Sequence, residues 1–326
     1  MKLFLGVDGG QSATTALIGD ERGRVIGAGR AGACNHASAA EGRAKFTRAL
    51  KECVRGALDR VATVIPESIA GSIQEVRFEA ACMGFSGGPA DKDALAHEIV
   101  TAEKYSITHD ASIALTGATG GTGVVIIAGT GSMAFGRNGE GRTARAGGWG
   151  YAFGDEGGAF HLVRQALRAS LRFEEGWGSP TALPEALLDA TGASNVNDLL
   201  HRFYSDEYPR ARIASLAKVV DEAARAGDAV AREILNEGAQ SLAMLGAAVR
   251  AGVFGSDEVV RVAYSGGVFR SAILLERMRA LVELEEGNRV VAPEHTAAEG
   301  ALIEAYRLGG VTCGITDAPL EKNSES

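Results

Sequence analysis

Two short segments of the chain combine glycines with hydroxyl side chains directly after an apolar run. The first is Gly9-Gly10-Gln11-Ser12-Ala13-Thr14, which follows Asp8, and the second is Gly129-Thr130-Gly131-Ser132, which follows Val124-Val125-Ile126-Ile127. Backbone amides and hydroxyls in such turns can hold phosphate oxygens, and a carboxylate beside them can hold Mg²⁺ through water. An ordinary hairpin turn explains either segment alone, but the pair predicts a triphosphate gripped from both sides.

Short β-rich runs that end in small-residue turns recur through the chain, at 3–10, 81–88, 123–132 and 262–269. Glycine in such turns lets backbone amides approach a ligand closely. Helical patterns lie between these runs, with apolar residues spaced by three or four. The predicted helices cover 41–62, 91–101, 157–171, 210–226, 228–253 and 296–307. Strands that alternate with helices indicate an α/β protein.

The opening segment predicts a β-meander. Residues 6–18 are predicted to form a strand, a turn and a second strand, and a turn at 20–23 precedes a third strand at 25–27. A Rossmann domain would pass from GxGxxG directly into a helix, and a P-loop would need GxxxxGK[ST]; the chain has neither pattern here. These two common nucleotide-binding folds are therefore excluded.

Composition limits the partners that the chain can have. Its 326 residues suffice for two domains, and 46% hydrophobic with 23% charged residues is typical of a globular protein. A formal net charge of −8 argues against nucleic acid as a partner. We find no secretory signal and no apolar run of the ~20 residues that a membrane span needs, so we expect no membrane association and a cytoplasmic location.

The four cysteines are scattered, at Cys34, Cys53, Cys82 and Cys313. None forms a CxxC pair, so the sequence suggests neither a zinc ribbon nor a local iron–sulfur site. We expect free thiols, as in a reducing compartment.

Five segments, in order along the chain, resemble a known set of motifs. They are GVDGGQSATTALI, ITHDASIAL, GVVIIAGTGS, VAYSGGVF and AAEGALIEA, and they run from Gly6 to about Ala305. Their order is similar to the first phosphate loop, first connecting segment, second phosphate loop, adenosine motif and second connecting segment of the actin/hexokinase/Hsp70 ATPase superfamily. The stretch AGGWGYAFGDEGGAF at 146–160 resembles the BadF/BadG/BcrA/BcrD ATPase family and, within it, the N-acetylglucosamine kinases.

The resemblance implies two actin-like ATPase (ribonuclease H-like) domains, each a mixed sheet flanked by helices, with an active-site cleft between them. We expect the N-terminal domain to hold 1–115 plus 296–313, the C-terminal domain to hold 116–295, and 314–326 to be a flexible tail. Gly300 would be the small residue at which two helices cross. The resemblance also implies a homodimer.

The resemblance further assigns roles to single residues. Asp110 would be the catalytic base that takes a proton from a sugar hydroxyl, and Asp8 would hold Mg²⁺. The residues expected to bind ATP are Gly9, Gly10, Gln11, Ser12, Thr14, Gly129, Thr130, Gly131, Ser132, Gly266 and Gly267. Those expected to bind the sugar are Asn35, Asp110, Gly148, Trp149 and Asp155.

Purely structural roles stay open for three of these residues. Asp110 and Asp155 could each cap a helix, and Asn35 could be a turn residue. His109 receives no role, because strand alternation should point its side chain to the opposite face of the sheet from its neighbour Asp110.

The implied function is an ATP-dependent amino-sugar kinase that transfers the γ-phosphate of ATP to a hexosamine hydroxyl, with N-acetylglucosamine as the first candidate. Met133 stands where animal N-acetylglucosamine kinases carry an asparagine, so glucosamine and N-acetylmuramic acid are rivals. The phosphorylated hydroxyl and the pathway, cell-wall recycling or chitin use, stay open.

Two functions without a sugar substrate are the alternatives. An activating ATPase of the same family would use clustered cysteines for an iron–sulfur cluster, and the cysteines here are scattered. An actin-like filament or scaffold would have no use for Asp110 and Asp155.

Overall fold

A computed structural model describes residues 1–34, 41–64 and 75–316 of the chain. The chain forms two compact units, one of Met1–Gly121 with Pro293–Ser326 and the other of Thr122–Ala292. Each unit has its own sheet and its own apolar core, and each is described by itself.

The sheet of the first unit has five strands in the order β3-β2-β1-β5-β7. The predicted meander is confirmed, since β1 (Leu3–Gly9), β2 (Thr14–Asp20) and β3 (Val25–Ala31) pair antiparallel. Strands β5 (Ala80–Phe85) and β7 (Tyr105–His109) then run parallel to β1. The carboxyl ends of β1, β5 and β7 therefore meet at one edge of the sheet. A short pair, β4 (Arg77–Phe78) with β6 (Thr101–Ala102), forms a separate ladder.

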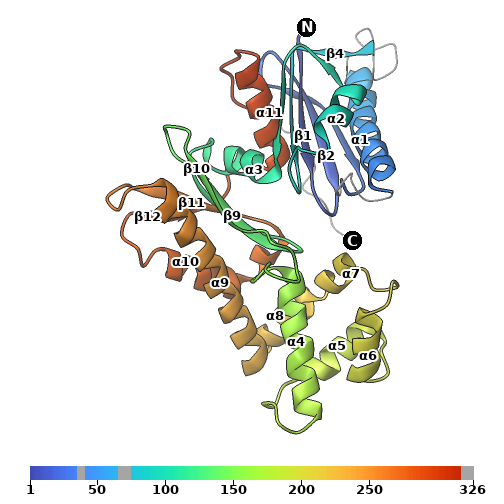
Figure 1. The fold of residues 1–326 in the computed structure, drawn as a ribbon, viewed down its shortest axis with the longest axis vertical. Coiled ribbons are helices and arrows are strands. Elements are labelled where there is room, and N and C mark those ends of the chain that lie inside the picture. The colour runs from blue at the N-terminus through green and yellow to red at the C-terminus, as the bar shows by residue number, and fades with distance from the viewer. Residues whose placement is uncertain (35–40, 65–74, 317–326) are drawn as a thin grey trace. The chain divides into compact units, whose positions relative to one another are not determined.

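Alternation along β1 gives this sheet two apolar faces. Leu3, Leu5 and Val7 belong to a core with the helices α1 (Gly42–Val64) and α2 (Asp93–Ile99), whereas Phe4 belongs to a second core. The second core includes side chains of α3 (Asp110–Thr119) and α11 (Ala297–Leu308). In Figure 1, α11 and α1 accordingly flank the strands of this unit from opposite sides.

Helices α3 and α11 approach each other closely at a pair of glycines. A Cβ on Gly300 would overlap the carbonyl of Ile113 and the backbone of Gly117. This confirms the predicted helix crossing at Gly300. The start of α11 is fixed by a capping box, in which the amide of Thr296 donates to the Glu299 carboxylate (2.7 Å) and the amide of Glu299 donates to the Thr296 hydroxyl (3.3 Å).

The sheet of the second unit repeats the topology of the first, in the order β10-β9-β8-β11-β12. Strands β8 (Gly123–Ala128), β9 (Ser132–Arg137) and β10 (Thr143–Gly147) form an antiparallel meander, and β11 (Val260–Ser265) and β12 (Asn288–Val291) add parallel to β8. The turn between β8 and β9 is thus the counterpart of the turn between β1 and β2. These are the two glycine–hydroxyl turns that the sequence singled out.

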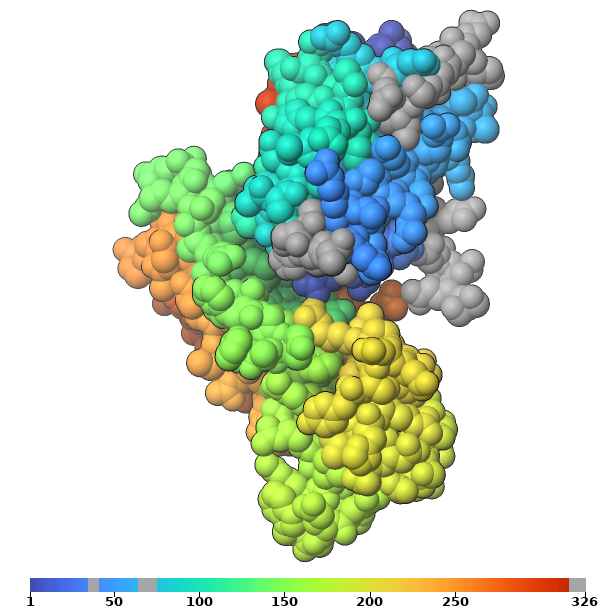
Figure 2. Space-filling model, turned by 45° about the vertical axis from the view of Figure 1, so that its right-hand side comes forward, coloured from blue at the N-terminus to red at the C-terminus, as the bar shows by residue number. Residues whose placement is uncertain are grey.

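Helices cover this second sheet and extend beyond it. The long helix α9 (Ala229–Val253) packs on the meander strands, with α10 (Ala272–Val282) beside it. A cluster of five further helices shares the same apolar core: α4 (Ala159–Glu174), α5 (Leu183–Thr191), α6 (Val196–Phe203), α7 (Arg210–Ser215) and α8 (Ala217–Arg225). The surface of α6 to α8 is the yellow body in Figure 2.

Several predicted elements differ in their bounds. The predicted helix at 210–226 is broken at Leu216, which ends α7 and starts α8 through a tight turn and is buried there. The run at 262–269 ends as a strand at Ser265, because Gly266 has φ +111° and the 3₁₀ helix η2 (Gly267–Arg270) follows. Helices α5, α6 and α10 were not predicted at all.

The chain is still bonded at the start of the predicted tail. The amide of Thr316 donates to the carbonyl of Gly23 in the β2–β3 turn (3.1 Å). Among the described helices, none is long and apolar enough to cross a bilayer.

Candidate active site

The acidic part of the candidate site lies at the carboxyl edge of the first sheet. Gly9 is in register with Phe85, and Phe85 is in register with His109. The strand ends therefore bring together Asp8 on β1, Ser86 just after β5 and Asp110 just after β7. Two of these are the carboxylates that the sequence predicted, and Ser86 is a residue that sequence reasoning missed.

Asp110 is the first residue of α3, and its carboxylate is held by two donors. Oδ1 accepts from the amide of Ala111 (2.9 Å), and the Ser86 hydroxyl also donates to the carboxylate. The N-cap position belongs to His109, so Asp110 is not the cap that the alternative role required. Burial raises the pKa of Asp110, while the two hydrogen bonds oppose that rise.

Asp8 lies at the same edge of the sheet, where the charge of Asp110 acts on it. Burial, and next the negative charge of Asp110, raise the pKa of Asp8 to about 7. The raised pKa values of Asp8 and Asp110 show that negative charge is unfavourable at this site. A divalent cation with oxygen ligands would supply that compensation, so the residues fit Mg²⁺.

The first glycine turn is closed by bonds within the protein. The amide of Gly10 donates to the carbonyl of Ala13 (2.9 Å), and the carbonyl of Gly10 accepts from the amide of Cys34 (3.0 Å). Thr14 is fully buried and its hydroxyl donates to the carbonyl of Gly32 (2.7 Å). Gln11 and Ser12, by contrast, are exposed at the tip of the turn.

The turn after β5 carries a second feature that sequence reasoning missed. Lys92 is fully buried, and its Nζ donates to the carbonyl of Gly88 (3.1 Å) and to Asp91 Oδ1 (2.6 Å). The His109 ring packs on Gly88, where a Cβ would overlap it. The only local signal was the small-residue turn at 86–88, and nothing in it pointed to the buried lysine.

The second glycine turn is built on the start of α4 in the other unit. The carbonyls of Gly129 and Thr130 accept from the amides of Ala159 (2.8 Å) and Phe160 (3.1 Å) in the first turn of that helix. Ser132 is buried and its hydroxyl donates to the carbonyl of Glu156 (2.5 Å). The loop is therefore fixed to the segment Gly154-Asp155-Glu156-Gly157.

Asp155 belongs to the same assembly. It is buried, and it is the one non-glycine residue with positive φ (63°) in the described part of the chain. Its carboxylate lies against Gly131, where a Cβ would overlap it. The N-cap of α4 is Gly158, so Asp155 does not occupy the capping position.

The predicted sugar wall and adenosine loop both adjoin this turn. The amide of Gly148 donates to the carbonyl of Ser132 (3.0 Å), and a Cβ on Gly148 would lie 3.5 Å from Met133 Cβ. Trp149 is 65% exposed, with the Arg145 guanidinium 5.2 Å from its ring. On the other side, a Cβ on Gly266 would overlap the carbonyl of Ala128, while Gly267 faces open space.

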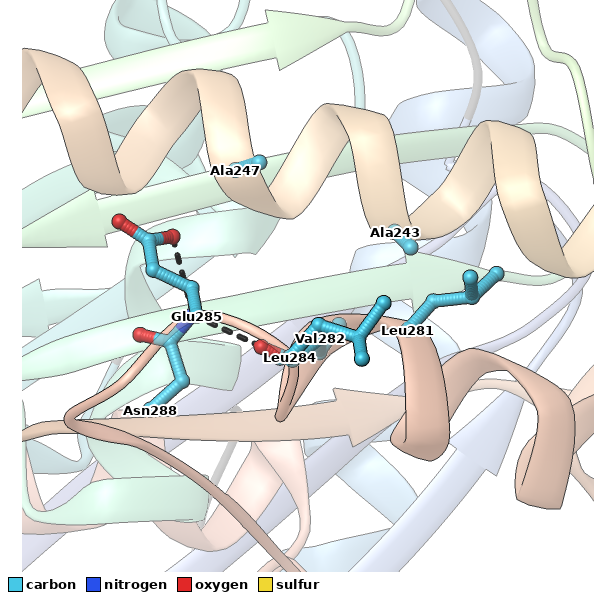
Figure 3. Close-up of a pocket in the computed structure, with 7 residues that line it drawn as sticks. All are labelled: Ala243, Ala247, Leu281, Val282, Leu284, Glu285 and Asn288. Carbon is cyan, nitrogen blue, oxygen red and sulfur yellow. Dashed lines mark hydrogen bonds between the residues drawn. The ribbon is translucent and has the colours of Figure 1, made fainter.

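A cavity of about 320 Å³ in this unit is lined by other residues (Figure 3). It sits between α9 and the end of α10, and its walls are Ala243, Ala247, Leu281, Val282, Leu284, Glu285 and Asn288. The Asn288 amide donates to the carbonyl of Val282 (3.0 Å) and to Glu285 (3.2 Å), and Arg250 binds both polar residues. Its polar groups are thus bonded to one another, and the length of α10 separates it from Gly266.

The structure brings together Asp8, Asp110 and the first turn in one unit, and the second turn, Gly148, Trp149, Asp155 and Gly266 in the other. Asn35 lies outside the described residues. Two meander sheets, each with a glycine turn at its first hairpin, define an actin-like ATPase fold, which confirms the predicted fold class. Residues 5–305 match the BadF/BadG/BcrA/BcrD ATPase family, and the chain belongs to that family.

Two relatives carry assigned activities. The chain is 30% identical over 313 residues to an N-acetylmuramic acid/N-acetylglucosamine kinase of Clostridium acetobutylicum, a match that covers 94% of this chain and 98% of that one. It is also 30% identical over 284 residues to an N-acetyl-D-glucosamine kinase of Dictyostelium discoideum, covering 84% and 88% of the two chains.

A solved structure agrees with the fold over nearly the whole chain. A candidate N-acetylglucosamine kinase from Chromobacterium violaceum superposes with a TM-score of 0.73 at 25% identity, covering 93% of this chain and 98% of that one.

Proposed function

We propose that the chain is an ATP-dependent amino-sugar kinase, which transfers the γ-phosphate of ATP to a hydroxyl of a hexosamine, with N-acetylglucosamine as the first candidate. The observation that carries this proposal is Asp110, a carboxylate at a strand-to-helix junction, held by two donors beside a second carboxylate. The two kinase relatives, matched over 94% and 84% of the chain, support the same substrate class.

Asp110 acts as the general base in this proposal. The Ala111 amide and the Ser86 hydroxyl fix the orientation of its carboxylate and favour its ionised form, which can accept the proton of the sugar hydroxyl. Phosphoryl transfer needs positioning and charge stabilisation more than covalent chemistry, so a well-oriented carboxylate is what the protein must provide.

Asp8 is the residue proposed to hold Mg²⁺ through water. When bound with ATP, the ion neutralises charge on the phosphate oxygens. Burial first, and next the charge of Asp110, raise the pKa of Asp8 in the absence of a cation, and a bound cation would oppose both effects.

The two glycine turns are proposed to hold the phosphates, and Gly266 with Gly267 to lie against the adenosine. We assign this contact to Gly9, Gly10, Gln11 and Ser12 in the first turn and to Gly129, Thr130 and Gly131 in the second. The hydroxyls of Thr14 and Ser132 donate to the carbonyls of Gly32 and Glu156. We therefore infer that these two residues shape the turns, rather than offering their hydroxyls to phosphate.

The sugar is proposed to contact Asp155, Gly148, Trp149 and Asn35. A buried carboxylate can accept from sugar hydroxyls, and an exposed indole can stack on the apolar face of a pyranose. Because Met133 lies beside Gly148, an apolar thioether is part of the same wall.

A coupled assay of ATP turnover tests the proposal. The purified chain is given Mg·ATP with N-acetylglucosamine, glucosamine, N-acetylmuramic acid, glucose or no sugar. Stimulation by an amino sugar, with a sugar phosphate as product, is expected. Turnover that no sugar stimulates would favour an activating ATPase or a scaffold instead.

A homodimer and a cytoplasmic location remain part of the proposal. The four cysteines are free, which suits a reducing compartment. Light scattering coupled to size-exclusion chromatography measures the oligomeric state, and a mass near 33.7 kDa would argue against the dimer.

A further inference from the structure

We propose that Ser86 is a positioning residue for the catalytic base, Asp110. The inference rests on the proposed kinase function and adds a residue to its machinery. Strand β5 lies between β1 and β7 in the sheet, so the first residue after β5 sits between the Asp8 turn and Asp110. That residue is Ser86.

Ser86 forms hydrogen bonds with residues at the ends of both adjacent strands. Its amide donates to the carbonyl of Gly9 at the end of β1 (2.9 Å), and its hydroxyl donates to the Asp110 carboxylate. One residue, through its backbone amide and its side chain, thus connects the first glycine turn to the base. A hydroxyl directly after β5 is well placed for this, because β5 is paired on both sides, with β1 and with β7.

The turn that contains Ser86 is stabilised by hydrogen bonds of Gly88 and Lys92. The amide of Gly88 donates to the carbonyl of Phe85 (3.0 Å), and the carbonyl of Gly88 accepts from the fully buried Nζ of Lys92 (3.1 Å). Lys92 also binds Asp91 (2.6 Å). These bonds leave Ser86 little freedom to move away from Asp110.

The Ser86 bond gives the Asp110 carboxylate a second fixed point. The Ala111 amide binds Oδ1 (2.9 Å), but a single bond leaves rotation about Cβ–Cγ open. With Ser86 as a second donor, the carboxylate keeps one plane, and a remaining lone pair points in a constant direction. Such alignment is what proton transfer in a transition state requires.

Ser86→Ala tests this role through the split between kcat and KM. Loss of a hydrogen bond to a charged group should lower kcat by about 10- to 100-fold. KM for ATP and for the sugar should stay within about threefold, because Ser86 is assigned contact with neither. Ser86→Thr keeps the hydroxyl and should restore most of kcat. Ser106→Ala is the control, since Ser106 lies on the same sheet but binds Cys82 rather than Asp8 or Asp110.

A double-mutant cycle separates positioning from a general structural effect. If Ser86 acts through Asp110, Ser86→Ala should cost nothing further in an Asp110→Asn background. Losses that multiply would overturn the proposal, as would a Ser86→Ala enzyme with unchanged kcat. The melting temperature of each variant checks the fold.

Failure of the proposed function would look different. A wild-type chain that no sugar stimulates removes the kinase assignment and the role of Ser86 together. An active wild type with an unchanged Ser86→Ala variant removes the role of Ser86 alone.

Discussion

The carboxylate of Asp155 lies directly against Gly131, so close that a Cβ on the glycine would overlap both carboxylate oxygens. Asp155 reaches this position with φ at 63°, a backbone conformation that costs energy in residues other than glycine. A residue proposed to bind the sugar is thereby in contact with a loop proposed to bind phosphate. Asp155 and the Gly131 loop would therefore bind the two substrates as one rigid unit.

Gly131→Ala should therefore weaken the binding of both the sugar and ATP. The methyl group displaces the carboxylate or the loop, and such overpacking costs about 1–3 kcal/mol of folding free energy. We expect a lower melting temperature and a higher KM for both sugar and ATP. Differential scanning fluorimetry and steady-state kinetics measure the two effects.

Gly129→Ala is the matched control for stability, because a Cβ there meets nothing within 4 Å. Its melting temperature should equal that of the wild type. The cost of Gly131→Ala should also shrink in an Asp155→Gly background, where the carboxylate is gone. If the two changes were additive, the contact between Asp155 and Gly131 would not be the cause.

Asp110→Asn should lower kcat by about 10²–10⁴-fold, the usual contribution of a general base. The amide oxygen can still accept from Ala111 and Ser86, so the fold and the binding of both substrates should change little. Steady-state kinetics with both substrates varied measures this. A kcat within a few-fold of the wild type would remove Asp110 from the role of base.

Local patterns carried much of the sequence prediction. Residues 3–31 alternate and turn as a meander must, and Gly129-Thr130-Gly131-Ser132 follows an apolar strand, so their elements could be predicted from the sequence. The close helix packing at Gly300 was also predictable, because a glycine inside a helix needs a reason, but its partner Gly117 was not predicted.

Other features depend on contacts that no local pattern encodes. The hydrogen bond between Ser86 and Asp110 joins residues on different elements. Lys92 binds Gly88 and Asp91, which are close to it in the sequence, but its complete burial depends on how the surrounding elements pack, and a lysine is normally expected to be exposed. The break at Leu216 is a tertiary effect too, since the residues on either side have good helix propensity. Within each unit the candidate residues could be found from their motifs, whereas the residues that support them could not.

Asp8 should make the stability of the substrate-free protein depend on pH. Its folded pKa of about 7 lies above the usual value of 3.8, so the folded state binds the proton more tightly. The contribution of Asp8 to stability is then full below about pH 4 and is lost as the pH rises through about 7. We expect the melting temperature of the metal-free wild type to fall between pH 5 and pH 8.

Asp8→Asn removes this titration, because the amide stays neutral. The variant should melt at a higher temperature than the wild type at pH 8 without Mg²⁺, and it should use Mg·ATP poorly. Asp59→Asn, an exposed position on α1, is the control and should follow the wild type. Parallel pH curves for Asp8→Asn and the wild type would contradict the raised pKa of Asp8.

The preference among amino sugars should depend on Met133, which lies beside Gly148 in the proposed sugar wall. A thioether cannot pair with a polar substituent, and an unpaired buried polar group costs about 1–3 kcal/mol, or roughly 5- to 150-fold in kcat/KM. The wild type should therefore phosphorylate at least one of N-acetylglucosamine, glucosamine and N-acetylmuramic acid, with glucose clearly poorer. Met133→Asn should raise kcat/KM for N-acetylglucosamine relative to the other sugars, whereas Met133→Leu, which keeps the volume, should leave the order unchanged. Equal effects of Met133→Asn on all four sugars would show that residue 133 does not contact the substituent that distinguishes them.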